Sequence, residues 1–389
     1  MKDMKEPEVQ FGIGPQKLLQ GMLGQGAKTA LIIDALKQCG HYRLKRIRKK
    51  SGGLRELHVP PAELKQLQKI ILKRFLCRFQ GKISFFCHGF VPGRSIITNA
   101  KQHQANKWKQ VIRLDLKDAF PSVKAETIRA ILRKLILPEV SDYADQYRAR
   151  KKYPKRWYKN IYHKHPIFPT RRVRWFRRLI VNNPYSNLAL DIAERFIDLL
   201  VSLMTYQGAI PQGAPTSPFL LNLVISDLGI PADIFRELND QGYEHELTIY
   251  ADDLVISTQK ELPGETVSRI TAIIEASGIF KVNQKKTVRF NRRQIAPLIT
   301  GLRVIKSYDQ TGHRQRDKIT VPKQKILAIR SLIHKATQEP SEDRDKRVAG
   351  YIAFLKGVYV PGGYGQTSTR HLPPAIWKPY EKYLEVKKF

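Results

Sequence analysis

The chain has 389 residues, of which 42% are hydrophobic, and its 69 lysines and arginines exceed its 34 aspartates and glutamates to give a formal net charge of +35. That content suffices for one large core or a few small ones, and the basic excess argues for a polyanionic partner such as nucleic acid. No apolar run approaches the ~18 residues of a membrane span, and the sequence has no signal-peptide pattern and no cysteine spacing typical of zinc or disulfides. We therefore expect a cytoplasmic protein without a membrane partner.

The first part of the chain is predicted to combine short helices with one hairpin. Residues 1–40 have the pattern of short helices interrupted by glycines. Tyr42–Ile47 and Leu54–Val59 are strand-like and are joined across Lys49–Gly53, which is a hairpin signal. Two prolines stop the second strand, and Ala62–Phe79 then has helical periodicity.

Two short polar motifs follow this helix. His88–Ser95 has the sequence His-Gly-Phe-Val-Pro-Gly-Arg-Ser, and Asn99–His103 places an asparagine and a histidine one helical turn apart. By itself such a pair is often only a satisfied polar pair within a helix. Its position just ahead of the first acidic strand makes it more informative.

Two acidic segments carry the candidate chemistry. Val111–Leu114 is strand-like and is followed by Asp115, and a second apolar run contains Tyr250-Ala251-Asp252-Asp253. Consecutive strand side chains point to opposite faces, so Asp252 and Asp253 can share a site only at a turn. A solvated hairpin turn is the plainer alternative. Carboxylates from separate segments can hold two cations about 4 Å apart, which makes the three aspartates candidate ligands of two Mg²⁺ ions, with Mn²⁺ as the alternative.

The segment Gln146–Leu190 contains no acidic residue and interleaves basic with aromatic side chains. Cations neutralise phosphates and aromatic rings stack on unpaired bases, so this composition indicates contact with nucleic acid. A solvated basic loop would not require so many aromatic residues. The candidate contacts are Arg156, Trp157, Arg172, Arg174 and Trp175. Whether the segment meets template, product or a partner protein stays open.

The second half adds further glycine, lysine and helical signals. Asp191–Thr205 is predicted to be an amphipathic helix, and Gly208–Pro218 is a loop that contains Pro-Gln-Gly and ends in Ser-Pro. Asn283–Thr287 has the pattern Asn-x-x-Lys-Thr. Helices are predicted for 322–338, with Leu327 on its inward face, and for 344–359, before a Gly/Pro-rich tail.

These motifs resemble the palm of reverse transcriptases. Asp115–Phe120 matches the family's first catalytic block, Gly208–Pro218 its Pro-Gln-Gly block and Tyr250–Asp253 its YxDD block, in the same order. The resemblance covers about residues 42–360. It implies an RNA-directed DNA polymerase with an α+β right-hand fold, in which fingers and a small helical thumb flank a palm made of an antiparallel sheet packed by helices.

The resemblance also implies domain boundaries. We expect N-terminal helices and fingers in 1–109, a palm in 110–305 and a thumb with a C-terminal tail in 306–389. Because the first and second blocks are farther apart than is usual in the family, the basic-aromatic segment near 140–180 is interpreted as an insertion.

Residue roles follow from the same resemblance. Lys286 joins Asp115, Asp252 and Asp253 as a catalytic residue near the triphosphate. Phe120 is expected to face the sugar and to reject a 2′-hydroxyl, which implies dNTP substrates. The other nucleotide-binding residues are Arg55, Lys50, Asp118, Ala119, Gln212, Gly213 and Tyr250. Besides the insertion, the nucleic-acid-binding residues are Arg94, Asn99, His103, Thr300 and Gly301.

Asn99–His103 (NAxxH) and Ile299–Gly301 (ITG) resemble marks of the retron branch, where valine is usual in place of Ile299. The branch implies an enzyme that copies a structured cognate non-coding RNA, primed from a 2′-hydroxyl, into short DNA covalently linked to RNA (msDNA). Such systems resemble anti-phage defence modules with an effector protein and higher-order assembly.

The alternatives are group II intron, diversity-generating or abortive-infection reverse transcriptases, and a mainly scaffolding component that binds nucleic acid and effector. An RNA-dependent RNA polymerase is a further alternative, against which Phe120 argues.

Overall fold

The computed structural model describes Leu19 and residues 28–48, 53–105, 107–152, 186–291, 296–308, 311, 314–359 and 371–387. The chain divides into two compact units, the first formed by Met1–Ser84 and Asp118–Leu228 and the second by Phe85–Lys117 and Gly229–Phe389. The expected boundaries after residues 109 and 305 describe a different division, into fingers, palm and thumb, and they stay a prediction.

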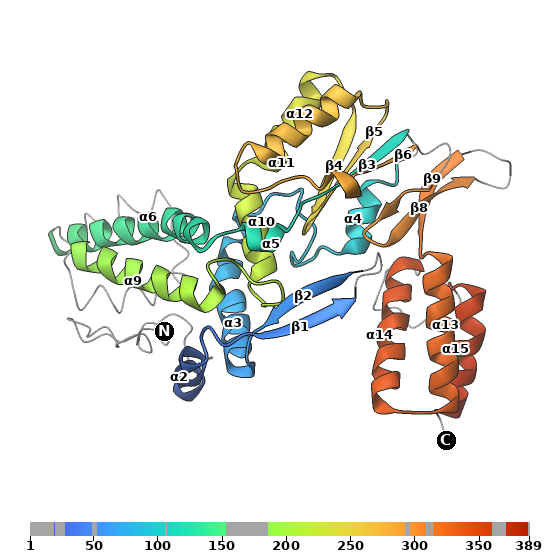
Figure 1. The fold of residues 1–389 in the computed structure, drawn as a ribbon, viewed down its shortest axis with the longest axis horizontal. Coiled ribbons are helices and arrows are strands. Elements are labelled where there is room, and N and C mark those ends of the chain that lie inside the picture. Colours follow the sequence, from blue (N-terminus) through green and yellow to red (C-terminus); the bar gives the residue numbers. More distant parts are fainter. Residues whose placement is uncertain are drawn as a thin grey trace. The chain divides into compact units, whose positions relative to one another are not determined.

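The first unit is mainly helical. In it, α6 packs along α9, and α3 packs against both α2 and α9 (Figure 1). Phe75 anchors this core, with its ring edge-on to that of Phe196 at 5.5 Å between centroids. Its helices are α2 (Thr29–Lys37), α3 (Ala62–Arg74), the 3₁₀ helix η2 (Leu76–Lys82), α5 (Ala119–Ser122), α6 (Ala125–Lys152), α9 (Ser186–Met204) and α10 (Ser217–Asp227).

A two-stranded hairpin also belongs to the first unit. Strands β1 (Arg43–Arg48) and β2 (Leu54–Val59) pair antiparallel, as predicted. Every residue of β1 is exposed. The His58 amide donates to the Gln212 carbonyl at 2.8 Å, which fastens β2 to the Pro-Gln-Gly loop.

The second unit contains the predicted antiparallel palm sheet. Its four strands are ordered β4-β5-β3-β6, with β4 (His245–Tyr250), β5 (Asp253–Thr258), β3 (Gln110–Asp115) and β6 (Val288–Asn291). The central strands β3 and β5 are buried along almost their whole length, which fits their apolar sequences. Helices α4 (Ile96–Gln102), α11 (Ile230–Asp240) and α12 (Gly264–Glu275) belong to the same unit.

The outer edge of β4 is covered by the loop before α4. The His88 amide donates to the Ile249 carbonyl at 2.6 Å, and the Ile249 amide donates to the Phe86 carbonyl at 2.8 Å. Cys87 thereby forms a parallel bridge with Ile249. The loop therefore adds a short fifth row to the sheet at the strand that leads to the acidic turn.

The C-terminal part combines a small sheet with three helices. Strands β7 (Leu298–Ile299), β8 (Leu302–Tyr308) and β9 (Arg314–Thr320) precede α13 (Lys323–Gln338), α14 (Glu342–Tyr359) and α15 (Pro374–Val386). Figure 1 shows the three helices side by side. Buried aliphatic residues such as Ile333, Ile352 and Ile376 form their common core.

Two expectations about this region are wrong. The Gly/Pro-rich tail includes the helix α15, because a proline is compatible with the first turn of a helix and Ile376 and Tyr383 bury one face. Leu327, predicted to point inward, is 48% exposed.

Among the described helices, none is by itself long and apolar enough to cross a membrane, and only α10 and α11 taken together reach that composition.

Candidate active site

Two antiparallel strands bring the three predicted aspartates to one end of the palm sheet. Asp115 is the last residue of β3 and lies directly across from Asp253, the first residue of β5. Asp252 lies in the two-residue turn between β4 and β5. The Leu116 amide donates to the Asp252 carbonyl at 2.8 Å, which ties this turn to the end of β3. The predicted acidic hairpin is therefore confirmed.

The backbone of the acidic turn is strained and tightly packed. Ala251 has a φ of 57°, a left-handed conformation for which such turns prefer glycine. Gly89 approaches so closely that a Cβ atom there would lie 2.6 Å from the Ala251 nitrogen and 3.1 Å from the Tyr250 carbonyl carbon. Only glycine fits at this position, and its backbone packs directly against the turn that carries the acids.

Lys286 faces Asp115 from a short turn beside β3. Its Nζ lies 2.9 Å from both carboxylate oxygens of Asp115. The Asn283 side chain donates to Asp115 Oδ2 at 3.3 Å, and the Asn283 amide donates to the Asp115 carbonyl at 2.8 Å. The Lys117 amide donates to the Lys281 carbonyl at 2.8 Å, which continues the pairing. The Asn-x-x-Lys-Thr motif is thus fastened to the strand that carries Asp115.

The carboxylates repel one another where they meet. Burial raises the pKa of Asp253 to about 6, and the neighbouring charges of Asp252 and Asp115 add to this, although Arg113 and Lys286 oppose it. The buried site therefore disfavours the charged form of Asp253. Strong perturbation by burial and a charged partner is typical of a functional site.

The chemistry of this donor set suits a hard divalent cation. Three carboxylates offer the oxygen ligands that Mg²⁺ and Mn²⁺ prefer, and a cation would relieve the repulsion that raises the pKa of Asp253. Among the described residues, however, no group of three or more His, Cys, Asp or Glu side chains is arranged to hold a metal ion. Lys286 occupies both oxygens of Asp115 instead.

An exposed phenylalanine lies beside the tyrosine of the acidic turn. Tyr250 and Phe90 have ring centroids 6.0 Å apart. Phe90 is 56% exposed and has a φ of 58°, which is rare for an aromatic residue. Tyr250 was predicted to bind nucleotide, and the neighbouring ring of Phe90 adds a second aromatic surface at this turn.

The predicted nucleotide contacts Arg55, Gln212 and Gly213 lie in the first unit. Arg55 is exposed on β2 opposite Ile47. Gly213 has a φ of +125°, and a Cβ there would lie 3.0 Å from the His58 carbonyl oxygen. Glycine is therefore required for the loop to pack on β2, and the Pro-Gln-Gly loop and the hairpin are joined through His58. Lys50 lies outside the described residues.

Asp118, Ala119 and Phe120 form the start of α5. Asp118 has a φ of 47°, and its carbonyl accepts from the amide and from the hydroxyl of Ser122, both at 3.0 Å. The left-handed residue turns the chain directly after the strand, which leaves Asp118 exposed, Ala119 buried and Phe120 half-buried.

Arg94 is engaged within the protein. Its guanidinium donates to the Phe85 carbonyl at 2.8 Å and also to the Cys87 carbonyl. Burial, together with the charge of Arg94, lowers the pKa of His88 to about 4, so this buried imidazole is neutral. Arg94 therefore shapes the loop that covers β4, and its predicted contact with template stays a prediction.

Asn99 and His103 are fully buried, whereas Thr300 and Gly301 form the turn between β7 and β8. Burial leaves the side chains of Asn99 and His103 no surface to offer to nucleic acid, which corrects the expectation of direct contact. Their hydrogen bonds are described below. The predicted contacts Arg156, Trp157, Arg172, Arg174 and Trp175 lie outside the described residues, although α6 extends into the predicted insertion as far as Lys152.

Sequence reasoning missed the roles of Gly89, Asn283 and His58. The first two lie within motifs that the sequence displays, so a signal existed, but the motif letters do not say which backbone each residue must approach. His58 carried no signal, since its contribution is a backbone amide.

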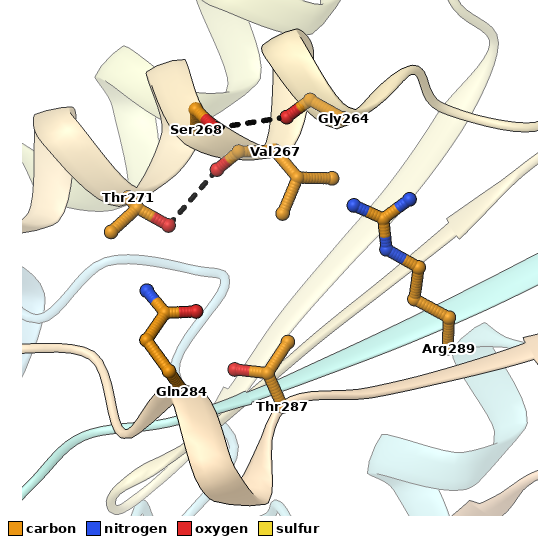
Figure 2. A pocket seen from close by; sticks show the side chains of 7 residues that line it. All are labelled: Gly264, Val267, Ser268, Thr271, Gln284, Thr287 and Arg289. Carbon is orange, nitrogen blue, oxygen red and sulfur yellow. Dashed lines mark hydrogen bonds between the residues drawn. The ribbon is translucent and has the colours of Figure 1, made fainter.

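A pocket of about 440 Å³ lies beside the turn that carries Lys286 (Figure 2). Gln284 and Thr287 from this turn face Ser268 and Thr271 of α12, with Arg289 at one side. The hydroxyls of Ser268 and Thr271 donate to carbonyls of their own helix, at 3.0 and 2.9 Å. These two hydroxyls are therefore already paired, and none of the three candidate aspartates is among the residues that line the pocket.

Comparison with known proteins places this geometry in a family. The family model described as reverse transcriptase (RNA-dependent DNA polymerase) matches residues 47–302, a range that includes the acidic turn, Lys286 and the Pro-Gln-Gly loop.

Curated relatives are retron enzymes. The Retron Mx65 reverse transcriptase of Myxococcus xanthus is 29% identical over 81% of this chain and 61% of its own length. The Retron Ec73 reverse transcriptase of Escherichia coli is 25% identical over 85% of this chain and 87% of its own length. The chain thus spans less than two thirds of the Mx65 protein.

Likeness to solved structures is weaker. Telomerase from Candida albicans, solved in complex with a TWJ fragment of telomeric RNA, is 12% identical, with a TM-score of 0.40 over 89% of this chain and 55% of that chain. A likeness at this level carries no argument about function. The family match, covering well over half of the chain, is sufficient: the protein belongs to the reverse transcriptase (RNA-dependent DNA polymerase) family.

Proposed function

We propose that this protein is an RNA-directed DNA polymerase of the retron type, which extends a primer with dNTPs on an RNA template. The observation that carries the proposal is the placement of Asp115 across from Asp253, with Asp252 in the adjoining turn and Lys286 beside them. Acids from two strands together with one lysine form the arrangement that nucleotidyl transfer needs.

Asp115, Asp252 and Asp253 would hold two Mg²⁺ ions, with Mn²⁺ as the alternative. Such ions lower the pKa of a primer hydroxyl and neutralise charge on the transferred phosphoryl group. Burial and the neighbouring charges of Asp252 and Asp115 raise the pKa of Asp253, and a bound cation would favour its charged form.

Lys286 would donate a proton to the leaving group. In the structure its ammonium bonds Asp115 through both oxygens, and its side chain is 52% exposed. With Asp115 engaged as a metal ligand, the Lys286 ammonium would be available to donate a proton to the departing pyrophosphate. The Asn283 hydrogen bonds keep the lysine near the acids during this exchange.

Phe120 would select deoxynucleotides by blocking a 2′-hydroxyl. Phe120→Ala is expected to raise ribonucleotide incorporation about tenfold or more. The dNTP-to-NTP ratio of kcat/KM measures this, and an unchanged ratio would remove Phe120 from substrate selection.

The finer proposal is synthesis of msDNA from a cognate non-coding RNA in the cytoplasm, as part of an anti-phage system with an effector protein. Two features support it: the curated relatives are retron enzymes, and the chain carries NAxxH at Asn99–His103 and ITG at Ile299–Gly301.

The deciding experiment examines the nucleic acid that copurifies from a host expressing the native locus. Samples are treated separately with RNase, DNase and a debranching enzyme. We expect a short DNA covalently tied to RNA in the wild type and in the control Asp240→Asn, an exposed acid on α11, and none in Asp252→Asn. Product from Asp252→Asn would refute the catalytic assignment. DNA without a branch would favour another branch of the family.

A scaffolding function is the second candidate, favoured by the net charge of +35 and the acid-free segment Gln146–Leu190. In that case deleting residues 148–178 abolishes hybrid retention and effector binding while primer extension continues. Retention and binding that survive the deletion would exclude it.

A further inference from the structure

Two buried polar side chains on or next to helix α4 reach two different hairpins. Asn99 lies within α4 and His103 directly follows it, and both side chains are 0% exposed. Asparagine and histidine are seldom completely buried unless they have partners. His103 bonds the β4–β5 hairpin, which carries the acids, and Asn99 bonds the β7–β8 hairpin.

His103 bridges the two strands of the acidic hairpin. Its Nε2 lies 2.8 Å from Thr248 Oγ1 on β4, and its Nδ1 lies 2.7 Å from Ser257 Oγ on β5. A hydroxyl can donate or accept, so both ring nitrogens are satisfied in either neutral tautomer. A slip of one strand by one residue would place the two hydroxyls on opposite faces of the hairpin, where a single ring could not bond both. The ring therefore fixes the register of the strands that carry Asp252 and Asp253.

Asn99 fixes a strained turn. Thr300 and Gly301 are the two central residues of the β7–β8 hairpin and have φ values of 46° and 84°. Such turns need left-handed residues at both positions, and a β-branched residue adopts this conformation only with strain. The Asn99 amide donates to Thr300 Oγ1 at 3.3 Å, and Thr300 Oγ1 donates to the Ile96 carbonyl at 3.3 Å. The side-chain hydroxyl thereby ties the strained residue to α4.

Packing alone does not explain the asparagine. Its Oδ1 is buried without a hydrogen-bond partner among the described residues. An apolar residue of similar size would avoid this unfavourable burial. The hydrogen bond to Thr300 is what an amide provides at this position and an apolar side chain cannot.

We propose that Asn99 and His103 are positioning residues that hold the acidic turn and the Thr300–Gly301 turn in fixed relation through α4. The proposal rests on the polymerase function, in which the first turn carries the proposed metal ligands and the second is expected to bind nucleic acid. It also gives a reason why the NAxxH and ITG motifs occur in one chain, since Asn99 of one bonds Thr300 of the other.

The test is a double-mutant cycle of Asn99→Ala and Thr300→Gly, read by thermal unfolding and by primer extension on an RNA template. Glycine adopts a left-handed φ freely, so Thr300→Gly removes the backbone strain of the residue that Asn99 holds in place. We expect Asn99→Ala to lower the Tm and to raise KM for primer–template about tenfold in the wild-type background, but about twofold or less in the Thr300→Gly background. The KM for dNTP should change little in either case.

Ala100→Gly is the matched control. It destabilises the same helix at a fully buried position whose methyl side chain has no hydrogen-bond donor or acceptor. Thr300→Gly is not expected to offset its effect on Tm or KM. For His103, glutamine keeps a donor and an acceptor whereas leucine keeps neither, so His103→Gln should retain more activity than His103→Leu.

The outcomes separate this proposal from the proposed function. Equal effects of Asn99→Ala in both backgrounds, or equal rescue of Ala100→Gly, would overturn the positioning role. Absence of RNA-templated synthesis in the wild type would instead refute the polymerase assignment, while the Tm cycle would still decide whether Asn99 and Thr300 are coupled.

Discussion

The β4–β5 turn and the β7–β8 turn each contain a strained residue, and a different kind of contact holds that residue in each turn. Each is a two-residue hairpin turn with a non-glycine residue in a left-handed conformation, Ala251 at a φ of 57° and Thr300 at 46°. Ala251 is held from outside, by the backbone of Gly89 pressed against it. Thr300 is held through its own hydroxyl, by hydrogen bonds to α4. One turn is kept in place by packing and the other by polar contacts.

The difference fits what each turn carries. At the acidic turn the side chains of Asp252 and Asp253 must stay available to cations, so restraint comes from a residue without a side chain. At the β7–β8 turn no charge has to be presented by Thr300, and its side chain is free to act as the restraint. Substitutions at and around the two turns test this difference.

Removing the charge of Lys286, which bonds Asp115, should have the largest effect on the rate of synthesis. Lys286→Met is expected to lower kcat by about 10²–10⁴-fold, the range for loss of a general acid. Primer extension with saturating dNTP measures it. The neighbouring Lys285 is exposed on the same turn and bonds neither Asp115 oxygen, so Lys285→Met serves as the control and should retain near-normal kcat. Equal losses in both variants would show that only the total charge matters.

Adding one methyl group at Gly89 should break the packing restraint. A Cβ 2.6 Å from the Ala251 nitrogen forces the acidic turn to move, and a displacement of about 1 Å can cost about 100-fold in rate. Steady-state primer extension by Gly89→Ala tests this. In the control Gly81→Ala the added Cβ has no atom within 4 Å, and we expect normal activity. A fully active Gly89→Ala variant would contradict the restraint by packing.

The acidic turn should also make stability depend on pH in an unusual direction. The pKa of Asp253 is raised from 3.8 to about 6, so the folded protein holds this proton more tightly than the unfolded chain does. The free energy of unfolding therefore falls as the pH rises from 3.8 to about 6. Above that range the stabilisation by the bound proton is completely lost. Asp253→Asn should increase stability at pH 8 by on the order of 1–3 kcal/mol and change it little below that range.

Chemical denaturation of the metal-free protein at several pH values measures this difference. Asp240→Asn, which replaces an exposed acid away from the site, is the control. A variant Asp253→Asn that is less stable than the wild type at pH 8 would contradict the assigned repulsion. The β7–β8 turn has no acid at its tip, so Thr300→Gly should leave the pH dependence unchanged.

Substituting glycine for Ala251 or for Thr300 should give the smallest effects, and the two variants should differ in the sign of the change in stability. Ala251→Gly relieves a left-handed alanine but also removes a methyl group that is 8% exposed, so it should stabilise the protein by less than about 1 kcal/mol. Thr300→Gly relieves similar strain but loses both hydroxyl hydrogen bonds, so its net effect should be close to zero or unfavourable. Thermal unfolding of the two variants checks the sign. Equal stabilisation by both would mean that the contacts of Thr300 contribute nothing.

Local patterns were sufficient for the elements that carry the chemistry. The apolar, β-favouring residues on both sides of Asp252 and Asp253 predicted a hairpin, the apolar run before Asp115 predicted a strand, and both are present. What the pattern could not supply is contact between distant segments. The approach of Gly89 to Ala251 depends on the parallel bridge between Cys87 and Ile249, which are far apart in sequence. The sequence around either residue does not indicate this contact.

Burial was the second limit. Asn99 and His103 were expected to bind nucleic acid because of the family resemblance, yet both side chains lie in the core. Polar side chains with one-turn spacing give the same pattern whether they face solvent or buried hydroxyls. The helix α15 was missed for a related reason, since prolines obscured a helix that is stabilised by burying Ile376 and Tyr383.

The loop that presses Gly89 against the acidic turn has a second consequence, for solubility. Strand β4 is the outermost strand of the palm sheet, and its free backbone groups would otherwise be open to pairing with another chain. The backbone pairing of Phe86 and His88 with Ile249 occupies part of this edge. The loop that packs against the acidic turn therefore leaves less of this sheet edge open to pairing, and we expect damage to it to increase aggregation as well as to impair the proposed synthesis.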